Sequence, residues 1–379
     1  MNQSVGIRSL AVTFPSVVRT NDYFRENFPE LIAVAEDQSL AKILSSSKSN
    51  SNQSSDPWVQ EAKPYLSDLF RGTVERRALG LGESSLTLEL DAARKALEAA
   101  KLSLSEIDLL LVSSFFSENL HLGNAAYLAE QLGINCPAWN LDSMCASGVV
   151  ALQTASAFIR SGEYKNILVV TSCTFSRFLD AKDTVQFSLG DGASAFVVAP
   201  LKENQGILGT KAINSHESCG IFFNALSTDA NGNPKMVVRA NRKTGKKVGP
   251  LFSKYLHECC FGALEAANIT LDQIDFFTCF TATAWYSDFC VRELGIDPEK
   301  TINVYPKYGN IGAVSTVANL YHAAESNKIR PNDLVLFYSH GFVSSAAAIV
   351  MRWGDVALGP VPTPSESLMK EKELAKVAV

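Results

Sequence analysis

Apolar and polar positions follow two recurring patterns along the chain, one typical of amphipathic helices and one typical of short buried strands. Residues 88–102 have helical spacing, and residues 107–114, which follow them, are mostly apolar. The same succession returns at 252–269 and 274–280. Strands that alternate with helices at this spacing are typical of predominantly parallel sheets covered by helices. The pattern therefore predicts an α/β fold.

The two successions are related by a constant offset, which indicates an internal repeat. Residues 102–114 align with 269–280 so that Ile107 matches Ile274, an offset of 167 residues. A second pair of segments aligns at the same offset: 166–173 and 333–340. Two blocks that share one offset indicate a duplicated chain.

We therefore predict two α/β halves, residues 1–200 and 201–379, related by pseudo-twofold symmetry. The Ser/Asn-rich segment 45–56 departs from this pattern and is typical of a flexible surface insertion. The end of the chain, from about residue 361, combines Pro and charged residues with few apolar ones, so we expect it to be peripheral.

Composition narrows the function classes. The 379 residues carry a formal net charge of −5, so no basic face for nucleic acid or an anionic membrane is expected. We expect a cytoplasmic protein, because neither a signal peptide nor an apolar stretch of roughly 20 residues is present. The 8 cysteines show no CxxC spacing, so we expect no metal site and no disulfide framework.

Cys145 is the candidate nucleophile, in the segment "DSMCASGVV" directly before an apolar helical run. The offset matches it to Gly312, and both segments follow a short strand, so we expect them at one functional edge. A helix N-terminus stabilises a thiolate by about 0.3 to 2 kcal/mol. We therefore expect a lowered pKa and a partly ionised thiol at pH 7. The alternative is a small residue packed beneath a helix.

Four segments together resemble the thiolase superfamily, and specifically its β-ketoacyl-acyl-carrier-protein synthase III branch: 70–80, 140–170, 187–198 and 305–315. The likeness runs in order from about residue 5 to residue 355. It implies a layered αβαβα fold of two duplicated halves with two mixed, mainly parallel sheets. It also implies a homodimer and no resident cofactor, because substrates in this family travel on coenzyme A or on the phosphopantetheine of an acyl-carrier protein.

The resemblance implies that Cys145 accepts an acyl group from such a thioester. A second thioester, malonyl or β-ketoacyl, would then take the acyl group from the enzyme. The N–H groups of Cys145 and Gly341 would stabilise the oxyanion. Asn310, in "YGNIGAVS", matches the asparagine of the family's site.

One family position differs. Phe280 stands where the family has its active-site histidine, in "FTAT" in place of H-x-x-N. Loss of such a donor typically costs about 10² to 10³ in rate. His340, one residue before Gly341, is the candidate replacement base, against a packed or dimer-facing imidazole. Glu118 is a weaker candidate, against a solvated loop carboxylate.

Substrate contacts are expected from four further residues: Arg71, Arg76, Leu122 and Thr283. The arginines could meet the phosphates of coenzyme A or of a carrier arm, and surface salt bridges are the alternative. The interpretation is a ketosynthase III-like acyltransferase of specialised lipid or polyketide metabolism. Two alternatives stay open, namely acyl transfer to an O, N or S nucleophile without decarboxylation, and a non-catalytic partner subunit of an active ketosynthase.

Overall fold

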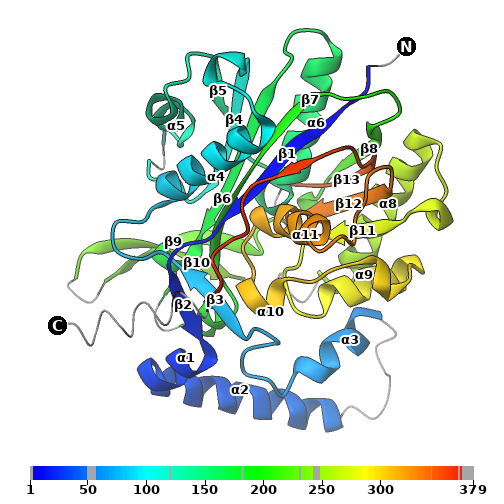
Figure 1. Ribbon diagram of the computed structural model, residues 1–379. Coiled ribbons are helices and arrows are strands. Elements are labelled where there is room, and N and C mark those ends of the chain that lie inside the picture. Colours follow the sequence, from blue (N-terminus) through cyan, green and yellow to red (C-terminus); the bar gives the residue numbers. More distant parts are fainter. Residues whose placement is uncertain are drawn as a thin grey trace.

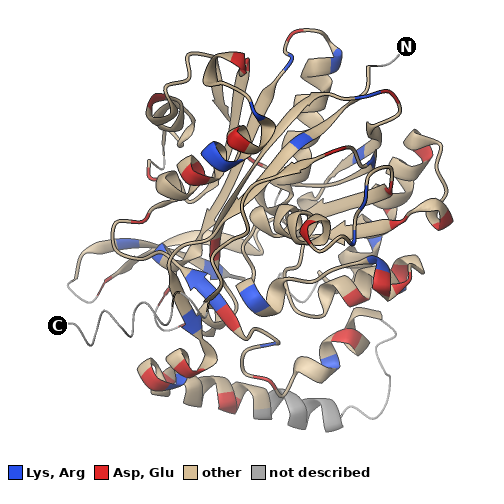
Figure 2. Ribbon diagram, viewed as in Figure 1, with Lys and Arg blue, Asp and Glu red and all other residues tan. Residues whose placement is uncertain are grey.

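The computed structural model describes residues 3–48, 57–119, 121–180, 183–229, 232–241, 248–342, 344–365 and 368. Two sheets and three layers of helices alternate, and the two central helices lie between the sheets (Figure 1). Acidic and basic residues are interspersed over these elements in the view of Figure 2, without one large region of a single sign.

The larger sheet has the strand order β14-β1-β7-β6-β4-β5. Its strands are β1 (Val5–Thr13), β4 (Leu109–Phe115), β5 (Ala138–Asn140), β6 (Ile167–Thr174), β7 (Asp191–Pro200) and β14 (Ala357–Leu358). β4 pairs in parallel with both β5 and β6, whereas β7 is antiparallel to β1 and β6. All residues of β6 are buried, as expected of a central strand covered on both faces.

The smaller sheet has the order β11-β12-β13-β8. Its strands are β8 (Gly206–Asn214), β11 (Phe276–Cys279), β12 (Leu334–His340) and β13 (Ser345–Arg352). β12 is parallel to β11 and antiparallel to β13. Both sheets are therefore mixed.

Helices α6 (Ser147–Arg160) and α11 (Val314–Glu325) lie between the sheets and carry the central core. They approach closely at Gly148, where an added Cβ would lie 2.9 Å from Val317 Cγ2. Helices α4 (Ser85–Ala100) and α5 (Ala125–Leu132) cover the outer face of the larger sheet. Helices α8 (Gly249–Ala267) and α9 (Tyr286–Leu294) cover the outer face of the smaller one.

The repeat predicted from the sequence is visible in where the elements lie. The residue number at which an element begins differs by 167 between the two halves. This holds for the 3₁₀ helices η2 (Leu104–Glu106) and η7 (Leu271–Gln273), and for β4 and β11. The starts of α6 and α11 differ by the same number. The sheet register adds one residue afterwards, because Ile167 pairs opposite Leu109 whereas Val335 pairs opposite Phe276. From this point the structural offset is 168.

The remaining elements pack beside these layers. They are β2 (Val17–Thr20), α1 (Asn21–Asn27), α2 (Pro29–Lys48), α3 (Pro57–Ala62), β3 (Glu75–Ala78), β9 (Phe222–Thr228), β10 (Pro234–Ala240) and α10 (Tyr305–Tyr308). The short 3₁₀ helices are η1 (Lys63–Tyr65), η3 (Met144–Ala146), η4 (Phe175–Arg177), η5 (Thr184–Phe187), η6 (His216–Ser218) and η8 (Pro298–Lys300). β9 and β10 form an antiparallel pair of their own.

The predicted insertion 45–56 is corrected in part. Residues 45–48 form the last turn of α2, which runs from Pro29 to Lys48. Residues 49–56 lie outside the described part of the chain, as does most of the predicted peripheral tail.

Candidate active site

Cys145 lies in a tight turn between β5 and α6. The preceding residue, Met144, has φ 53°, in the left-handed region that costs a non-glycine residue about 1–2 kcal/mol. Cys145 then belongs to the single 3₁₀ turn η3, and α6 begins two residues later at Ser147. The predicted position at a helix N-terminus is therefore what the structure has. Strain of this kind is found at functional sites when surrounding contacts maintain it.

Local hydrogen bonds hold this turn. Asp142 Oδ1 accepts from the Met144 N–H at 2.8 Å. The hydroxyl of Ser147 donates to the Met144 carbonyl at 2.7 Å and accepts from the Ser143 N–H at 2.8 Å. The polar residues around the cysteine thus fix the backbone on both sides of it.

The second half of the chain also holds the turn. Ser339 Oγ, on β12, donates to the Cys145 carbonyl at 2.8 Å. Ser345, on β13, is hydrogen-bonded through its hydroxyl to that of Ser143. Gly341 packs directly on the turn, since an added Cβ would lie 2.4 Å from the Ser143 carbonyl oxygen. The nucleophile turn therefore depends on residues about 200 positions away.

The electrostatic prediction for Cys145 is wrong. Burial, reinforced by the negative charge of Asp142, raises the pKa of the Cys145 thiol to about 12, although its own backbone N–H acts in the opposite direction. The resting thiol is therefore protonated at neutral pH. The loss of hydration outweighs the helix terminus here, so thiolate formation needs a base or a bound substrate.

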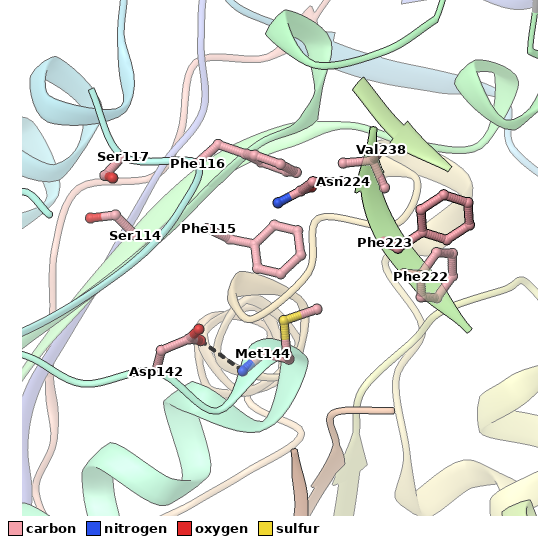
Figure 3. A pocket seen from close by; sticks show the side chains of 10 residues that line it. All are labelled: Ser114, Phe115, Phe116, Ser117, Asp142, Met144, Phe222, Phe223, Asn224 and Val238. Atoms are coloured by element: carbon pink, nitrogen blue, oxygen red, sulfur yellow. Dashed lines mark hydrogen bonds between the residues drawn. The ribbon is translucent and has the colours of Figure 1, made fainter. Parts of the chain in front are cut away.

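A cavity of about 350 Å³ opens beside the turn (Figure 3). Asp142 and Met144, which flank the cysteine closely in sequence, line one side of it. Ten residues line it in all: Ser114, Phe115, Phe116, Ser117, Asp142, Met144, Phe222, Phe223, Asn224 and Val238. They come from the end of β4, from the cysteine turn and from the β9–β10 pair. Aromatic walls with a few polar groups are typical of ligand sites.

The walls of this cavity are braced against one another. The rings of Phe116 and Phe178 are stacked with centroids 4.3 Å apart, and Phe116 has φ 82°. The Val238 N–H, on β10, donates to the Phe178 carbonyl at 3.0 Å. The β9–β10 pair is thereby fixed to the segment that follows β6.

Asn310 lies in the mirror segment before α11. Its side-chain Oδ1 accepts from the Gly312 N–H at 2.9 Å, and its backbone N–H donates to the Ser188 carbonyl at 2.7 Å. Within the described chain, its Nδ2 makes no hydrogen bond and can donate to a ligand. Gly312 (φ 55°) lies against Cys173, where an added Cβ would be 2.7 Å from Sγ. Burial raises the pKa of the Cys173 thiol, and a charge on Cys145 would raise it further.

The predicted oxyanion role of the Gly341 N–H is corrected. This N–H donates to the Ser345 carbonyl at 2.7 Å and closes the turn between β12 and β13. An N–H that is already paired cannot also be a free donor for an oxyanion. Glycine is required at this position because of the close packing on Ser143 and Met144.

The proposed base role of His340 is also corrected. Neighbouring side chains on a strand point to opposite faces, and Ser339 points to Cys145. His340 points to the outer layer, where Nδ1 pairs with the Tyr286 hydroxyl at 3.0 Å and the ring centroid lies 5.9 Å from that of Phe252. Burial lowers the pKa of His340 to about 3, so the ring is neutral.

Phe280 and Thr283 follow β11. Phe280 is buried, and its ring meets His340 edge-on with centroids 5.4 Å apart. The Oγ1 of Thr283 is buried and has no hydrogen-bond partner among the described residues. The ring of Phe280 therefore fills this position and packs against the neutral imidazole of His340.

Neither Glu118 nor Leu122 is among the residues that line the cavity. Glu118 Oε1 accepts from the Ser85 N–H at 3.0 Å and from its hydroxyl at 3.1 Å, at the start of α4. Leu122 is 58% exposed and is not part of the cavity lining.

The guanidinium groups of Arg71, which is half-buried, and of Arg76, which is buried, both donate to backbone carbonyls. Arg71 donates to the carbonyls of Tyr65 and Leu66, each at 2.6 Å. Arg76 is 1% exposed, donates to the Phe187 carbonyl and stacks over Phe24 at 4.6 Å. Burial lowers the pKa of Arg76 to about 9. Burial therefore contradicts the predicted phosphate contact of Arg76, whereas that of the half-buried Arg71 stays a prediction.

Sequence reasoning missed the cavity and a buried acid, Glu89. The signal for the cavity was weak, because residues 114–117 and 222–238 are distant in sequence. Glu89 had a clearer signal, since it lies four residues after Ser85 and three before Ala92, on the apolar face of a helix.

No group of His, Cys, Asp or Glu that could hold a metal is found among the described residues, and none of the helices described there could cross a membrane.

The family models and the sequence relatives that match this chain all carry the name of one family. The family model for 3-oxoacyl-[acyl-carrier-protein (ACP)] synthase III matches residues 140–215, and that for its C-terminal part matches residues 264–353. The β-ketoacyl-[acyl-carrier-protein] synthase III of Agrobacterium fabrum is 30% identical over 305 residues, which is 79% of this chain and 92% of the relative. The chain belongs to the 3-oxoacyl-[acyl-carrier-protein] synthase III family.

Solved structures of this family and of a related protein share the fold. The Pseudomonas aeruginosa 3-oxoacyl-(acyl carrier protein) synthase III has a TM-score of 0.74 at 19% identity, covering 94% of this chain and 100% of that one. Xanthomonas campestris OleA has a TM-score of 0.72 at 18% identity, covering 93% and 97%. The predicted family and the layered α/β fold class are thus confirmed.

Proposed function

We propose that this synthase III homologue forms an acyl thioester on Cys145 and passes the acyl group to a second substrate. The donor would be an acyl-coenzyme A or acyl-carrier-protein thioester, and the acceptor a malonyl or β-ketoacyl thioester. The role would lie in specialised lipid or polyketide biosynthesis. The names of the relatives, which specify synthases acting with an acyl-carrier protein, support this donor class.

The observation that carries the proposal is the cysteine turn itself. It is strained at Met144, held by serines from both halves, and located beside a cavity of about 350 Å³. A cavity of this size lies at the lower end of the range for small-molecule sites. Its aromatic wall suits the apolar part of an acyl group, and Asn310, in the mirror segment, is the candidate hydrogen-bond donor.

A second candidate is acyl transfer without decarboxylation, to an oxygen, nitrogen or sulfur nucleophile. Phe280 favours it, because an aromatic ring cannot donate a hydrogen bond to the enolate that forms when malonyl thioesters lose carbon dioxide. Asn310 favours the condensing reaction. The two reactions share the same acyl-Cys145 intermediate and differ in the acceptor.

The proposal is tested by intact-protein mass spectrometry after incubation with acetyl-, octanoyl- and palmitoyl-coenzyme A and with the matching acyl-carrier-protein thioesters. We expect an acyl adduct on the wild-type chain and none on Cys145→Ala. Cys219→Ala is the matched control, because Cys219 is an exposed free thiol that could be acylated nonspecifically. Adduct formation must survive in this control.

Addition of malonyl-coenzyme A to the acyl-enzyme then separates the two candidates. Release of a β-ketoacyl product with carbon dioxide supports condensation, and an adduct that persists supports transfer to another acceptor. If no donor gives an adduct, both enzyme hypotheses fail and a non-catalytic partner subunit remains. We also expect a homodimer, which light scattering would contradict by giving the monomer mass.

A further inference from the structure

Glu89 is a carboxyl group on the apolar face of α4, and it has no solvent-exposed surface. It lies between α4 and the larger sheet, in a layer whose other members are almost all aliphatic. Burying a carboxyl group there costs several kcal/mol unless hydrogen bonds compensate for it. The chain keeps the carboxyl group and surrounds it with partners.

Three side chains bind the Glu89 carboxyl. The hydroxyls of Ser114 (2.6 Å) and Ser172 both donate to Oε1. Asn124 Nδ2 donates to Oε2 at 2.9 Å. The partners come from β4, from β6 and from the start of α5. Glu89 is therefore held in one position at the carboxyl ends of two parallel strands.

Ser114 connects this carboxyl to the cavity beside Cys145. Ser114 is among the residues that line the cavity, and Figure 3 shows its side chain beside that of Ser117. Because its hydroxyl hydrogen is donated to Glu89, lone pairs of the oxygen remain available to accept from a group in the cavity. Ser172, on the neighbouring strand, is fully buried and does not line the cavity.

The hydrogen-bond network continues to the surface on the other side. Asn124 Nδ2 also donates to the Ser85 hydroxyl at 3.0 Å, and this hydroxyl donates to Glu118 Oε1 at 3.1 Å. Glu118 is exposed. A continuous set of side chains thus links solvent, Glu89 and the cavity.

The surroundings of Glu89 act on the pKa of its carboxyl group in both directions. Burial raises the pKa of Glu89 to about 7, and the hydrogen bonds from Ser114, Ser172 and Asn124 limit the rise. The charged group that acts on it is Glu118, which adds to the rise. Near neutral pH the carboxyl can therefore both accept and return a proton.

We propose that Ser114 and Glu89 form a proton relay that takes up the proton of the acceptor as it attacks the acyl group on Cys145. The inference rests on the proposed acyl-Cys145 intermediate and deepens it. It assigns an acceptor that loses a proton, such as a β-ketoacyl α-carbon or a hydroxyl, in place of one that loses carbon dioxide.

The step balances as follows. The acceptor X–H gives its proton to Ser114 Oγ while the Ser114 hydroxyl proton moves to Glu89 Oε1, and the bond from X to the acyl carbon forms. The bond from the acyl carbon to Cys145 Sγ then breaks, and the departing thiolate takes up the proton that the relay returns. The products are the acylated acceptor and the Cys145 thiol. Ser114 would contact the substrate, and Glu89 is a positioning and proton-holding residue behind it.

The two serines provide a matched test, because both donate to the same carboxyl oxygen and only Ser114 reaches the cavity. The acyl-enzyme is formed with octanoyl-coenzyme A, or with whichever donor of the panel gives the adduct. Loss of the adduct is then timed by mass spectrometry in buffer, where water is the acceptor, and with acetoacetyl-coenzyme A.

We expect Ser114→Ala to slow adduct loss about 100-fold, the usual size of a general-base contribution. Ser172→Ala should slow it less than about tenfold, as expected for a lost hydrogen bond alone. The wild-type rate should rise with pH through an inflection near 7, and Ser114→Ala should remove this inflection. The rate of adduct loss is measured only on protein that already carries the adduct, so a change in adduct formation does not affect the comparison.

Equal effects of the two alanine variants, or an unchanged pH profile in Ser114→Ala, would overturn the relay and leave the acyl-enzyme intact. The same conclusion follows if Asp142→Asn, which alters the carboxylate that lines the cavity, removes the inflection while Ser114→Ala does not. Absence of an adduct in every protein is a different result, since it contradicts the proposed function itself and the relay with it.

Discussion

The two outer layers of the duplicated fold have corresponding helices and strands, but the buried residues at corresponding positions differ in polarity. At the offset of 167, Glu89 on α4 corresponds to Leu256 on α8, and both are fully buried against a sheet. Ser85 corresponds to Phe252. On the strands, where the offset is 168, Ser172 corresponds to His340. The first layer is thus a polar network around a carboxyl, and the second an aromatic and aliphatic core around a neutral imidazole.

The same arrangement of helix and sheet thus holds a polar hydrogen-bond network in the first half and an aromatic core in the second. The polar layer ends at Ser114 on the cavity wall, so it can exchange protons with a bound molecule. In the aromatic layer, five rings pack around His340: those of Phe252, Phe280, Tyr286, Tyr338 and Phe342. Among the described residues, the buried carboxyl of Glu89 thus belongs to the first half, whereas the corresponding layer of the second half holds the neutral imidazole of His340.

The largest expected effect comes from transferring the carboxyl to the second layer. Leu256→Glu places an acid in a cluster that includes Cys260, Phe277 and Tyr338, without the hydroxyl and amide partners of Glu89. We expect the free energy of unfolding at pH 7 to fall by more than about 4 kcal/mol, measured by urea denaturation.

Leu256→Met is the control for this change, because it conserves volume and polarity and should cost less than about 1.5 kcal/mol. A Leu256→Glu protein as stable as Leu256→Met would contradict the contrast between the layers.

The next effect is a pH dependence that belongs to Glu89. Its pKa is raised from 4.5 to about 7 in the folded chain, so its protonated form is favoured on folding. The stability it supports is complete below pH 4.5 and lost as the pH rises through 7. Relative to wild type, Glu89→Gln should therefore gain up to about 3 kcal/mol between pH 4.5 and pH 8.

Urea denaturation of both proteins at several pH values measures this gain, and pH-independent costs of the glutamine cancel in the difference. A constant gap between the two curves would show that Glu89 does not titrate in this range.

A smaller effect is expected at Gly312, before α11, which corresponds to Cys145 before α6. Gly312→Ala combines a left-handed φ with a Cβ 2.7 Å from Cys173 Sγ. We expect it to cost about 2 to 3 kcal/mol, from strain and overpacking together. Gly295→Ala is the matched control, because Gly295 has φ 73° and open space around it.

The control should cost only about 1 kcal/mol, from the backbone alone. Equal losses in the two variants, measured by thermal or urea unfolding, would mean that the contact with Cys173 does not constrain the segment that carries Asn310.

The smallest effect concerns His340. His340→Phe removes the hydrogen bond between the Tyr286 hydroxyl and the imidazole and should lower stability by about 1 kcal/mol. Formation of the acyl adduct on Cys145 should change less than about threefold, whereas removal of a general base costs about 100-fold or more. A large loss of adduct formation at unchanged stability would restore His340 as the base.

Much of the fold was predictable because it depends on local pattern. The alternation of apolar strands and amphipathic helices determines the layers, and one offset relates the two halves through α6 and α11. The place of Cys145 at the start of α6 followed from the same pattern. The Arg76 side chain was misjudged because a charged residue in a polar segment reads as exposed, whereas in the fold its guanidinium stacks on Phe24.

The sequence by itself determined the α/β class, the duplication, the family and the position of the cysteine, because each depends on short-range periodicity or on motifs in a fixed order. Tertiary structure alone decided which face each strand-end side chain takes, since one additional residue before β12 turns His340 outward and Ser339 toward Cys145. It also decided the protonation of the thiol, because burial outweighs the helix terminus. The cavity and the Glu89 network unite residues from separate elements, and only the packed layers bring those residues together.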